Sequence, residues 1–97
     1  MMLIESLLSV NKSSQVPVYL QISNGIINYI RQGTLKPGSA LPASRALSAS
    51  LNVHRKTVVA AYDELYAQSW VDVISRKGIY VAKNLPMLHP GLLKKLF

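Results

Sequence analysis

Cysteine is missing from this 97-residue sequence. Disulfide bonds and thiolate metal ligands are therefore excluded. The two histidines, His54 and His89, are too isolated to predict a zinc site. We expect a cytoplasmic protein that binds neither a metal ion nor a cofactor within this chain.

Long apolar runs and acidic residues are also scarce. No segment approaches the roughly 18 consecutive apolar residues of a transmembrane helix. The first ten residues contain Glu5 and lack the basic residues of a secretory signal. With four carboxylate side chains, no glycine-rich phosphate loop and no nucleophile elbow, the chain is predicted not to be an enzyme.

Positive charge dominates what is present. Eleven Lys and Arg residues against four Asp and Glu residues give a formal net charge of +7. This excess favours an acidic partner, either nucleic acid or an anionic membrane surface, and charge alone does not distinguish them. An apolar content of 49% predicts a folded chain, and its length suits one domain.

The most regular helical pattern begins at Pro17, which suits a first helical position. Apolar residues then recur three or four positions apart until Gly33 ends the pattern. They are Tyr19, Ile22, Ile26 and Ile30. A turn around Pro37 and Gly38 then predicts that the chain reverses between Gly33 and Pro42.

Two closely spaced helices are predicted next. One runs from Ala43 or Ser44 to Leu51 and ends at Asn52, which tolerates a left-handed backbone. The other begins near His54 or Arg55 and runs to about Gln68 (residues 54–68). Its buried stripe consists of Val58, Ala61, Tyr62 and Leu65. Two helices joined by so short a turn predict a helix-turn-helix.

The hydrophobic period changes to two after Trp70, a predicted core residue. Valine and isoleucine alternate on both sides of residues 75–78, which indicates a two-stranded hairpin with a basic tip over about 71–82. The predicted fold class is α+β, mainly α: a winged helix-turn-helix of three helices and a two-stranded wing over residues 17–82. Residues 1–16 are expected to be an arm or short helix, and residues 83–97 a linker or tail.

The five tyrosines do not form the pattern of a base-stacking platform on a strand face. We expect them to pack in the core and between helices. They are Tyr19, Tyr29, Tyr62, Tyr66 and Tyr80.

The third helix carries an unusual outward face. At 100° per residue, burial of its stripe turns Lys56, Val59, Ala60 and Asp63 outward. Small apolar residues are uncommon on a face that meets only water. In a DNA major groove, Arg or Lys bonds guanine O6 and N7, and small apolar groups contact a thymine methyl. The predicted DNA contacts on this helix are Arg55, Lys56, Thr57 and Val59.

Two other sites add basic side chains. Ser44 and Arg45 lie at the start of the second helix, where free N–H groups favour a phosphate. Arg76, Lys77 and Gly78 form the hairpin tip, which suits a minor groove or the flanking backbone. Each cluster alone is also compatible with an ordinary solvated surface. The prediction of DNA binding depends on all three falling on one surface.

His54 immediately precedes the third helix. It is expected either to cap that helix or to contact a DNA phosphate, and the sequence leaves both alternatives open.

Several ordered segments of this sequence are similar to the amino-terminal domain of the GntR family of bacterial transcription regulators. They are residues 17–22, 33–42, 44–47, 53–65 and 78–81. The resemblance implies a winged helix that binds operator double-stranded DNA as a homodimer, with the effector sensed by a separate domain. By matching position, it implies DNA contacts at Arg45, Arg55 and Thr57, and a minor-groove wing tip at Lys77 and Gly78.

Residues 57–62 most resemble the MocR branch of that family. Its members carry a large pyridoxal-phosphate-binding domain of aminotransferase type, for which this chain is too short. The chain departs from the family at Ala43, where a capping Ser is common, and at residues 76–79, which lack the usual two-glycine wing. The leading prediction is a sequence-specific DNA-binding transcription regulator. The alternatives are the DNA-binding part of a MocR-like regulator, or a winged helix that docks a protein through Val59 and Ala60.

Overall fold

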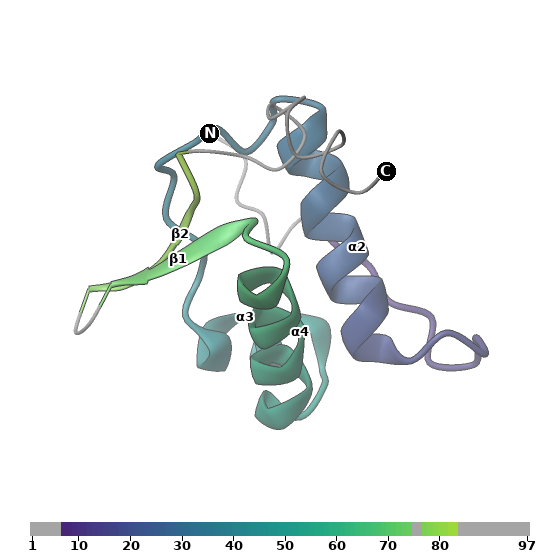
Figure 1. The fold of residues 1–97 in the computed structure, drawn as a ribbon. Helices are drawn as coiled ribbons and strands as arrows, with labels where there is room; N and C mark the ends of the chain where they lie inside the picture. Colours follow the sequence, from purple (N-terminus) through teal and green to yellow (C-terminus); the bar gives the residue numbers. More distant parts are fainter. Residues whose placement is uncertain (1–6, 75–76, 84–97) are drawn as a thin grey trace.

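The structure is a computed structural model and describes residues 7–74 and 77–83. Its elements follow the order α2 (Val18–Arg31), α3 (Ser44–Leu51), α4 (Arg55–Ala67), β1 (Val71–Ile74) and β2 (Gly78–Val81). In Figure 1, α2 and α4 lie beside each other and the hairpin projects away from them. Three helices followed by an antiparallel hairpin confirm the predicted winged helix-turn-helix.

Helix α2 forms one wall of the core. Ile22, Ile26 and Ile30 repeat every four residues, and each is at most 2% exposed. Pro17 is the residue before the first helical position, one place earlier than its predicted role. The helix ends just before Gly33, whose φ of 85° takes the chain out of the helical conformation. Within the described ranges, no helix is both long and apolar enough to cross a membrane.

Helices α3 and α4 are joined by the predicted short turn. Asn52 takes the left-handed conformation, with φ 56° and ψ 51°, and ends α3. The Val53 amide donates to the Ser48 carbonyl oxygen at 3.0 Å, which closes the end of this helix. All four residues of the predicted α4 stripe are buried, so the assigned inward face of that helix is confirmed.

The hairpin pairs Val71 with Val81 and Val73 with Ile79. Val71 and Val81 are each 1% exposed, whereas Val73 is 58% exposed because the hairpin continues beyond the core. The loop before α3 pairs with the other edge of β2, because the Leu41 amide donates to the Ile79 carbonyl oxygen at 2.8 Å. This loop–strand pairing anchors the base of the wing.

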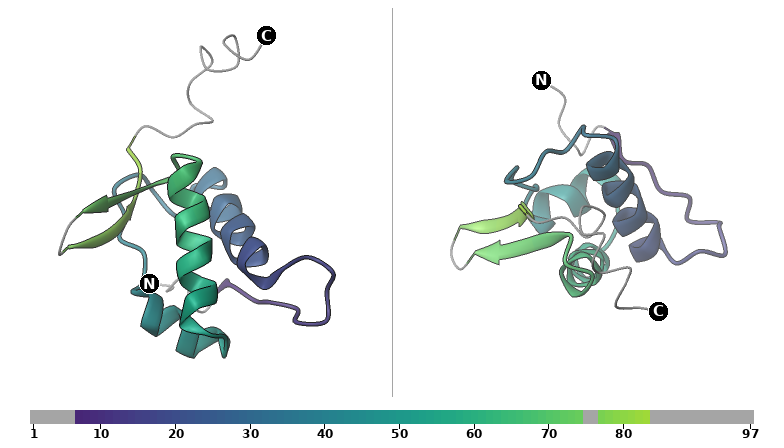
Figure 2. Two further views of the ribbon diagram at one scale, coloured as in Figure 1. Left: turned by 60° about the horizontal axis from the view of Figure 1, so that its bottom comes forward. Right: turned by 45° about the horizontal axis from the view of Figure 1, so that its top comes forward.

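The segment before α2 also packs on the domain. Leu8 is 8% exposed, and a Cβ on Gly25 would lie 2.8 Å from the Leu8 side chain. The Tyr29 hydroxyl donates to the Leu7 carbonyl oxygen at 3.0 Å. Figure 2 shows that this segment reaches α2 through a long loop, drawn in purple. The first six residues of the expected arm and residues 84–97 of the expected tail lie outside the described residues.

Aromatic residues divide between core and surface. Tyr62 is 3% exposed and donates its hydroxyl hydrogen to the Pro42 carbonyl oxygen at 2.7 Å. Trp70 is buried as predicted, but Tyr66 is 59% exposed, so its predicted packing role is wrong. Tyr66 follows Leu65 of the stripe by one residue, and a rotation of about 100° per residue turns its side chain outward.

The packing of Leu8 predicts that the segment before α2 contributes to stability. Leu8→Ala should lower the free energy of unfolding by roughly 2–3 kcal/mol, through lost burial and a cavity against α2. Val16→Ala truncates a residue of the same segment that is 44% exposed and should change stability little. Urea unfolding of both variants measures this, and equal stability would show that Leu8 is not part of the core.

The Tyr62 hydrogen bond gives a second stability prediction. Tyr62→Phe leaves the Pro42 carbonyl oxygen without this donor and should cost about 1–2 kcal/mol. Tyr66→Phe is the matched control, because Tyr66 lies on the same helix and is largely exposed. Thermal or urea unfolding should separate the two variants, and identical midpoints would rule out a stabilising role for the Tyr62 hydroxyl.

Candidate nucleic-acid interface

The outward face of α4 is as the sequence predicts. Lys56, Val59 and Asp63 are exposed, and Ala60 is half-buried. Val59 is 40% exposed although it is apolar. Thr57 is half-buried and lies to one side of this face. The first two turns of α4 therefore present a cationic side chain beside a small apolar one.

The start of α3 lies against the start of α4. The Arg55 Nε donates to the Ser44 hydroxyl oxygen at 3.1 Å, across eleven residues of sequence. The Tyr62 contact with Pro42 holds the residues leading into α3 in the same region. Arg45 is exposed at this helix start. Three predicted site residues, Ser44, Arg45 and Arg55, are thus brought together.

Neither helix start has a side-chain cap. Ala43 precedes α3 and makes no capping hydrogen bond, as its departure from the family pattern implied. His54 occupies the N-cap position of α4, but its side chain makes no capping hydrogen bond and is exposed. The structure therefore contradicts the first alternative for His54, side-chain capping. The second, a phosphate contact, stays a prediction. Backbone N–H groups in the first turns of both helices keep the capacity to donate to an anion.

The wing tip completes this face. The Lys77 amide donates to the Ile74 carbonyl oxygen at 3.0 Å, and Gly78 has a φ of 117°, a conformation open mainly to glycine. The Tyr80 hydroxyl donates to the Lys77 carbonyl oxygen at 3.2 Å and steadies the turn. Arg76 lies outside the described residues.

A single cleft of about 310 Å³ connects the three predicted sites. Ser44 lines it from α3, Val59 and Asp63 from α4, and Lys77 and Gly78 from the wing. We call it the reading cleft. Residues of α3, α4 and the wing therefore share one concave surface, whose lining includes one basic side chain, Lys77, and one carboxylate, Asp63.

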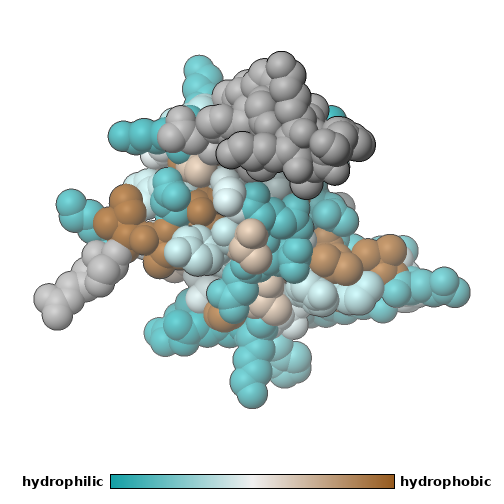
Figure 3. Space-filling model, viewed as in Figure 1, coloured by the Kyte–Doolittle hydropathy of each residue, from teal (hydrophilic) through white to brown (hydrophobic). Residues whose placement is uncertain are grey.

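The surface around the hairpin has a different character. Figure 3 shows apolar side chains gathered over the hairpin and again on the right of that view, and mostly hydrophilic ones at its lower edge, where α4 starts. The exposed apolar residues of β1 are Val73 at 58% and Ile74 at 44%. Polar and charged groups thus concentrate at the end of the molecule that carries the start of the predicted recognition helix.

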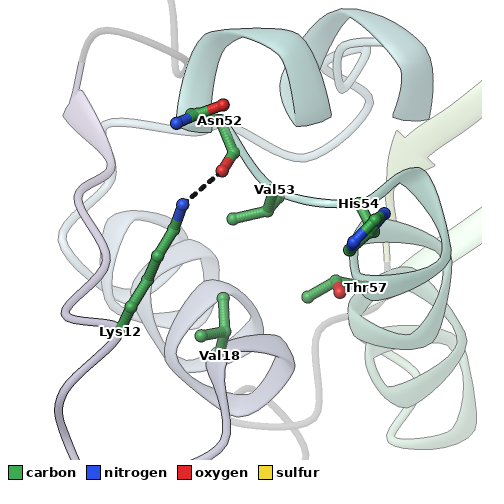
Figure 4. Close-up of a pocket in the computed structure, with 6 residues that line it drawn as sticks. All are labelled: Lys12, Val18, Asn52, Val53, His54 and Thr57. Carbon is green, nitrogen blue, oxygen red and sulfur yellow. Dashed lines mark hydrogen bonds between the residues drawn. The ribbon is translucent and has the colours of Figure 1, made fainter.

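One residue of this region was missed by the sequence analysis. Lys12 donates a hydrogen bond from its Nζ to the Asn52 carbonyl oxygen, across forty residues. It lines a pocket of about 400 Å³ together with His54 and Thr57 (Figure 4). Lys12 belongs to the polar run before α2, and a contact over such a sequence distance leaves no local pattern to find it by.

No group of three or more His, Cys, Asp or Glu side chains is placed to hold a metal ion in the described part of the chain. In that part of the chain, exposed basic side chains lie at the starts of α3 and α4 and at the hairpin tip.

Comparisons with known proteins agree with this geometry. The family model of the bacterial regulatory proteins of the gntR family matches residues 18–81. The pyridoxine biosynthesis transcriptional regulator PdxR of Corynebacterium glutamicum is 31% identical over 94 residues, 97% of this chain and 21% of its own length. The probable rhizopine catabolism regulatory protein MocR of Rhizobium meliloti is 32% identical over 80 residues, which cover 82% of this chain and 16% of that protein.

Among solved structures, the DNA-binding domain of AraR in complex with operator ORX1 superposes with a TM-score of 0.70 at 26% identity. The match covers 77% of this chain and 96% of that one. The chain spans only about a fifth of the length of the PdxR relative. The model match extends from the first residue of α2 to the last residue of β2. This chain belongs to the gntR family of bacterial regulatory proteins.

Proposed function

We propose that this chain binds operator DNA sequence-specifically and serves as the DNA-binding part of a bacterial transcription regulator. The observation that supports this function most directly is the reading cleft, where α3, the outward face of α4 and the wing tip meet. An operator complex of a protein with the same fold adds support. In this proposal the first two turns of α4 enter the major groove and the wing lies at the adjacent minor groove.

Base recognition is assigned to the start of α4. The Nε of Arg55 donates to Ser44, which leaves the terminal amino groups of its guanidinium for a bidentate contact with guanine O6 and N7. Val59 offers an exposed methyl surface for a thymine methyl group. Lys56 lies next to Val59 on the outward face and binds a base edge or a phosphate. Thr57 lies on the side of α4 that faces Lys12, and its assigned contact is with the DNA on that side.

Backbone contacts are assigned to the remaining site residues. Ser44 and Arg45 bind a phosphate at the start of α3, and His54 binds one at the start of α4. Lys77 and Gly78 approach the minor groove, because the hairpin projects sideways from the helices (Figure 1). Arg76, which the structure does not describe, is assigned to the same tip by sequence position.

The biological unit in this proposal is a homodimer in the bacterial cytoplasm, without catalytic activity in this chain. Two recognition helices about 34 Å apart would meet successive major grooves. Residues 57–62 support placement in the MocR branch. In that case a further domain, outside this chain, would bind pyridoxal phosphate and sense the effector.

Operator binding predicts a steep dependence on salt. The logarithm of the association constant should fall linearly with the logarithm of salt concentration, by about 0.9 for each phosphate neutralised. Fluorescence anisotropy with a labelled duplex containing the operator, selected from a random pool, measures this slope. Heparin serves as the competing polyanion. If heparin displaces the protein as readily as an unlabelled operator does, and no sequence is enriched, protein docking replaces DNA recognition as the function.

Arg55 and Lys77 should lose binding in different ways. Arg55→Ala should cost roughly 1–3 kcal/mol on the selected operator and relax the base preference at one position. Lys77→Ala should weaken binding about equally on all sequences and lower the salt slope. Arg31→Ala, at the far end of α2, is the control and should bind like the unchanged protein. If the two variants have the same sequence profile, the division between base and backbone contacts is wrong.

A further inference from the structure

The loop that carries Lys12 is fixed in place by side-chain hydrogen bonds. The Gln21 side chain accepts a hydrogen bond from the Asn11 amide at 2.7 Å. Its Nε2 donates to the carbonyl oxygens of Asn11 at 2.9 Å and Val16 at 2.8 Å. A residue of the first turns of α2 therefore holds both ends of the loop 11–16. Lys12 is held at a defined place beside the helix-turn-helix, although its side chain is exposed.

The Lys12 side chain reaches the turn between α3 and α4 (Figure 4). Its partner there is the carbonyl oxygen of Asn52, which carries no formal charge. Together with Val18, Asn52 and Val53, the residues His54 and Thr57 complete the lining of the pocket of about 400 Å³. None of these lining residues is acidic, so the ammonium charge is not neutralised within the pocket.

The pocket lies on the opposite side of α4 from the start of α3. Arg55 faces Ser44 of α3, whereas Thr57 lines the Lys12 pocket. Thr57 follows Arg55 by two positions, and at 100° per residue their side chains point about 200° apart around the helix axis. The first turn of α4 thus has α3 on one side and Lys12 on the other.

This placement matches the shape of a major groove. The groove is about 12 Å wide, close to the diameter of a helix with its side chains, and a phosphate backbone runs along each edge. If α4 enters the groove start first, Ser44 and Arg45 meet one backbone. The opposite backbone then passes the side that carries Lys12.

We propose that Lys12 binds a DNA backbone phosphate on the strand opposite the one contacted by α3. This inference rests on the proposed operator binding. It extends the DNA surface to the loop before α2 and makes that loop a second edge of a clamp around the recognition helix. The Nζ of Lys12 carries three donor hydrogens, so one can remain on the Asn52 carbonyl oxygen while another binds the phosphate.

A purely structural role for Lys12 makes a different prediction. If Lys12 only ties the loop to the turn, a neutral side chain that keeps an N–H donor should preserve binding at every salt concentration. If the charge binds phosphate, that same variant should lose one counterion-release contribution. Lys12→Gln separates the two roles, and Lys12→Arg keeps the charge.

The test uses the selected operator duplex and the unchanged chain, with Lys36→Ala as control. Lys36 is another exposed lysine, and it lies in the loop that follows α2. The affinity ratio between the unchanged protein and Lys12→Gln should shrink about eightfold for each bound copy when salt is raised tenfold, as one phosphate contact requires. Lys12→Arg and Lys36→Ala should keep the original slope. Urea unfolding checks that the variants remain folded.

Two outcomes separate the inference from the function on which it rests. If the unchanged protein binds the operator and Lys12→Gln shows the same salt slope, Lys12 is not a phosphate contact, while operator binding stands. If the unchanged protein binds no duplex, the proposed function itself fails. A duplex with an uncharged methylphosphonate replacing the predicted phosphate should abolish the difference between Lys12→Gln and the unchanged protein, and persistence of that difference would also overturn the assignment.

Discussion

The rotation of α4 about its own axis is the constraint on which the rest of this structure depends. Val58, Ala61 and Leu65 are fully excluded from solvent, and Tyr62 is 3% exposed. Burial of four such side chains on one stripe contributes several kcal/mol, so the helix cannot turn to present another face. The same burial directs Lys56 and Val59 outward and places the two sides of the first turn against α3 and the Lys12 pocket. The core thus determines which residues the protein offers to a partner.

Hydrogen bonds from side chains then set the positions of the neighbouring elements around that helix. Tyr62 holds the carbonyl oxygen of Pro42, and Arg55 contacts Ser44, so the start of α3 is located from within α4. Pairing of Leu41 with Ile79 attaches the base of the wing to the loop that leads into α3. Two helices and the wing are therefore linked through residues 41–44, which places basic groups from separate parts of the chain on one surface.

Local patterns in the sequence predicted most of the fold, because they report local physics. The α4 stripe, the left-handed Asn52 and the alternation around the hairpin each follow from side-chain period or backbone preference, and each is confirmed. The prediction that Tyr66 packs was wrong because its position, one residue after Leu65 of the stripe, turns its side chain outward. The loop pairing with β2 and the contact between Lys12 and Asn52 join residues about forty apart. Nothing in the neighbouring sequence marks such contacts. The described residues among those assigned to DNA contacts lie at the starts of α3 and α4 and at the wing tip, and their contacts remain predictions.

An NMR titration tests most directly whether a single surface, organised around the start of α4, meets the duplex. Amide resonances of the labelled chain are followed as the operator is added. The largest shifts should fall on the starts of α3 and α4, the wing tip and the loop that carries Lys12, with little change at Tyr66 or the far end of α2. Shifts centred on Tyr66 and the exposed apolar residues of β1 would contradict the assigned surface.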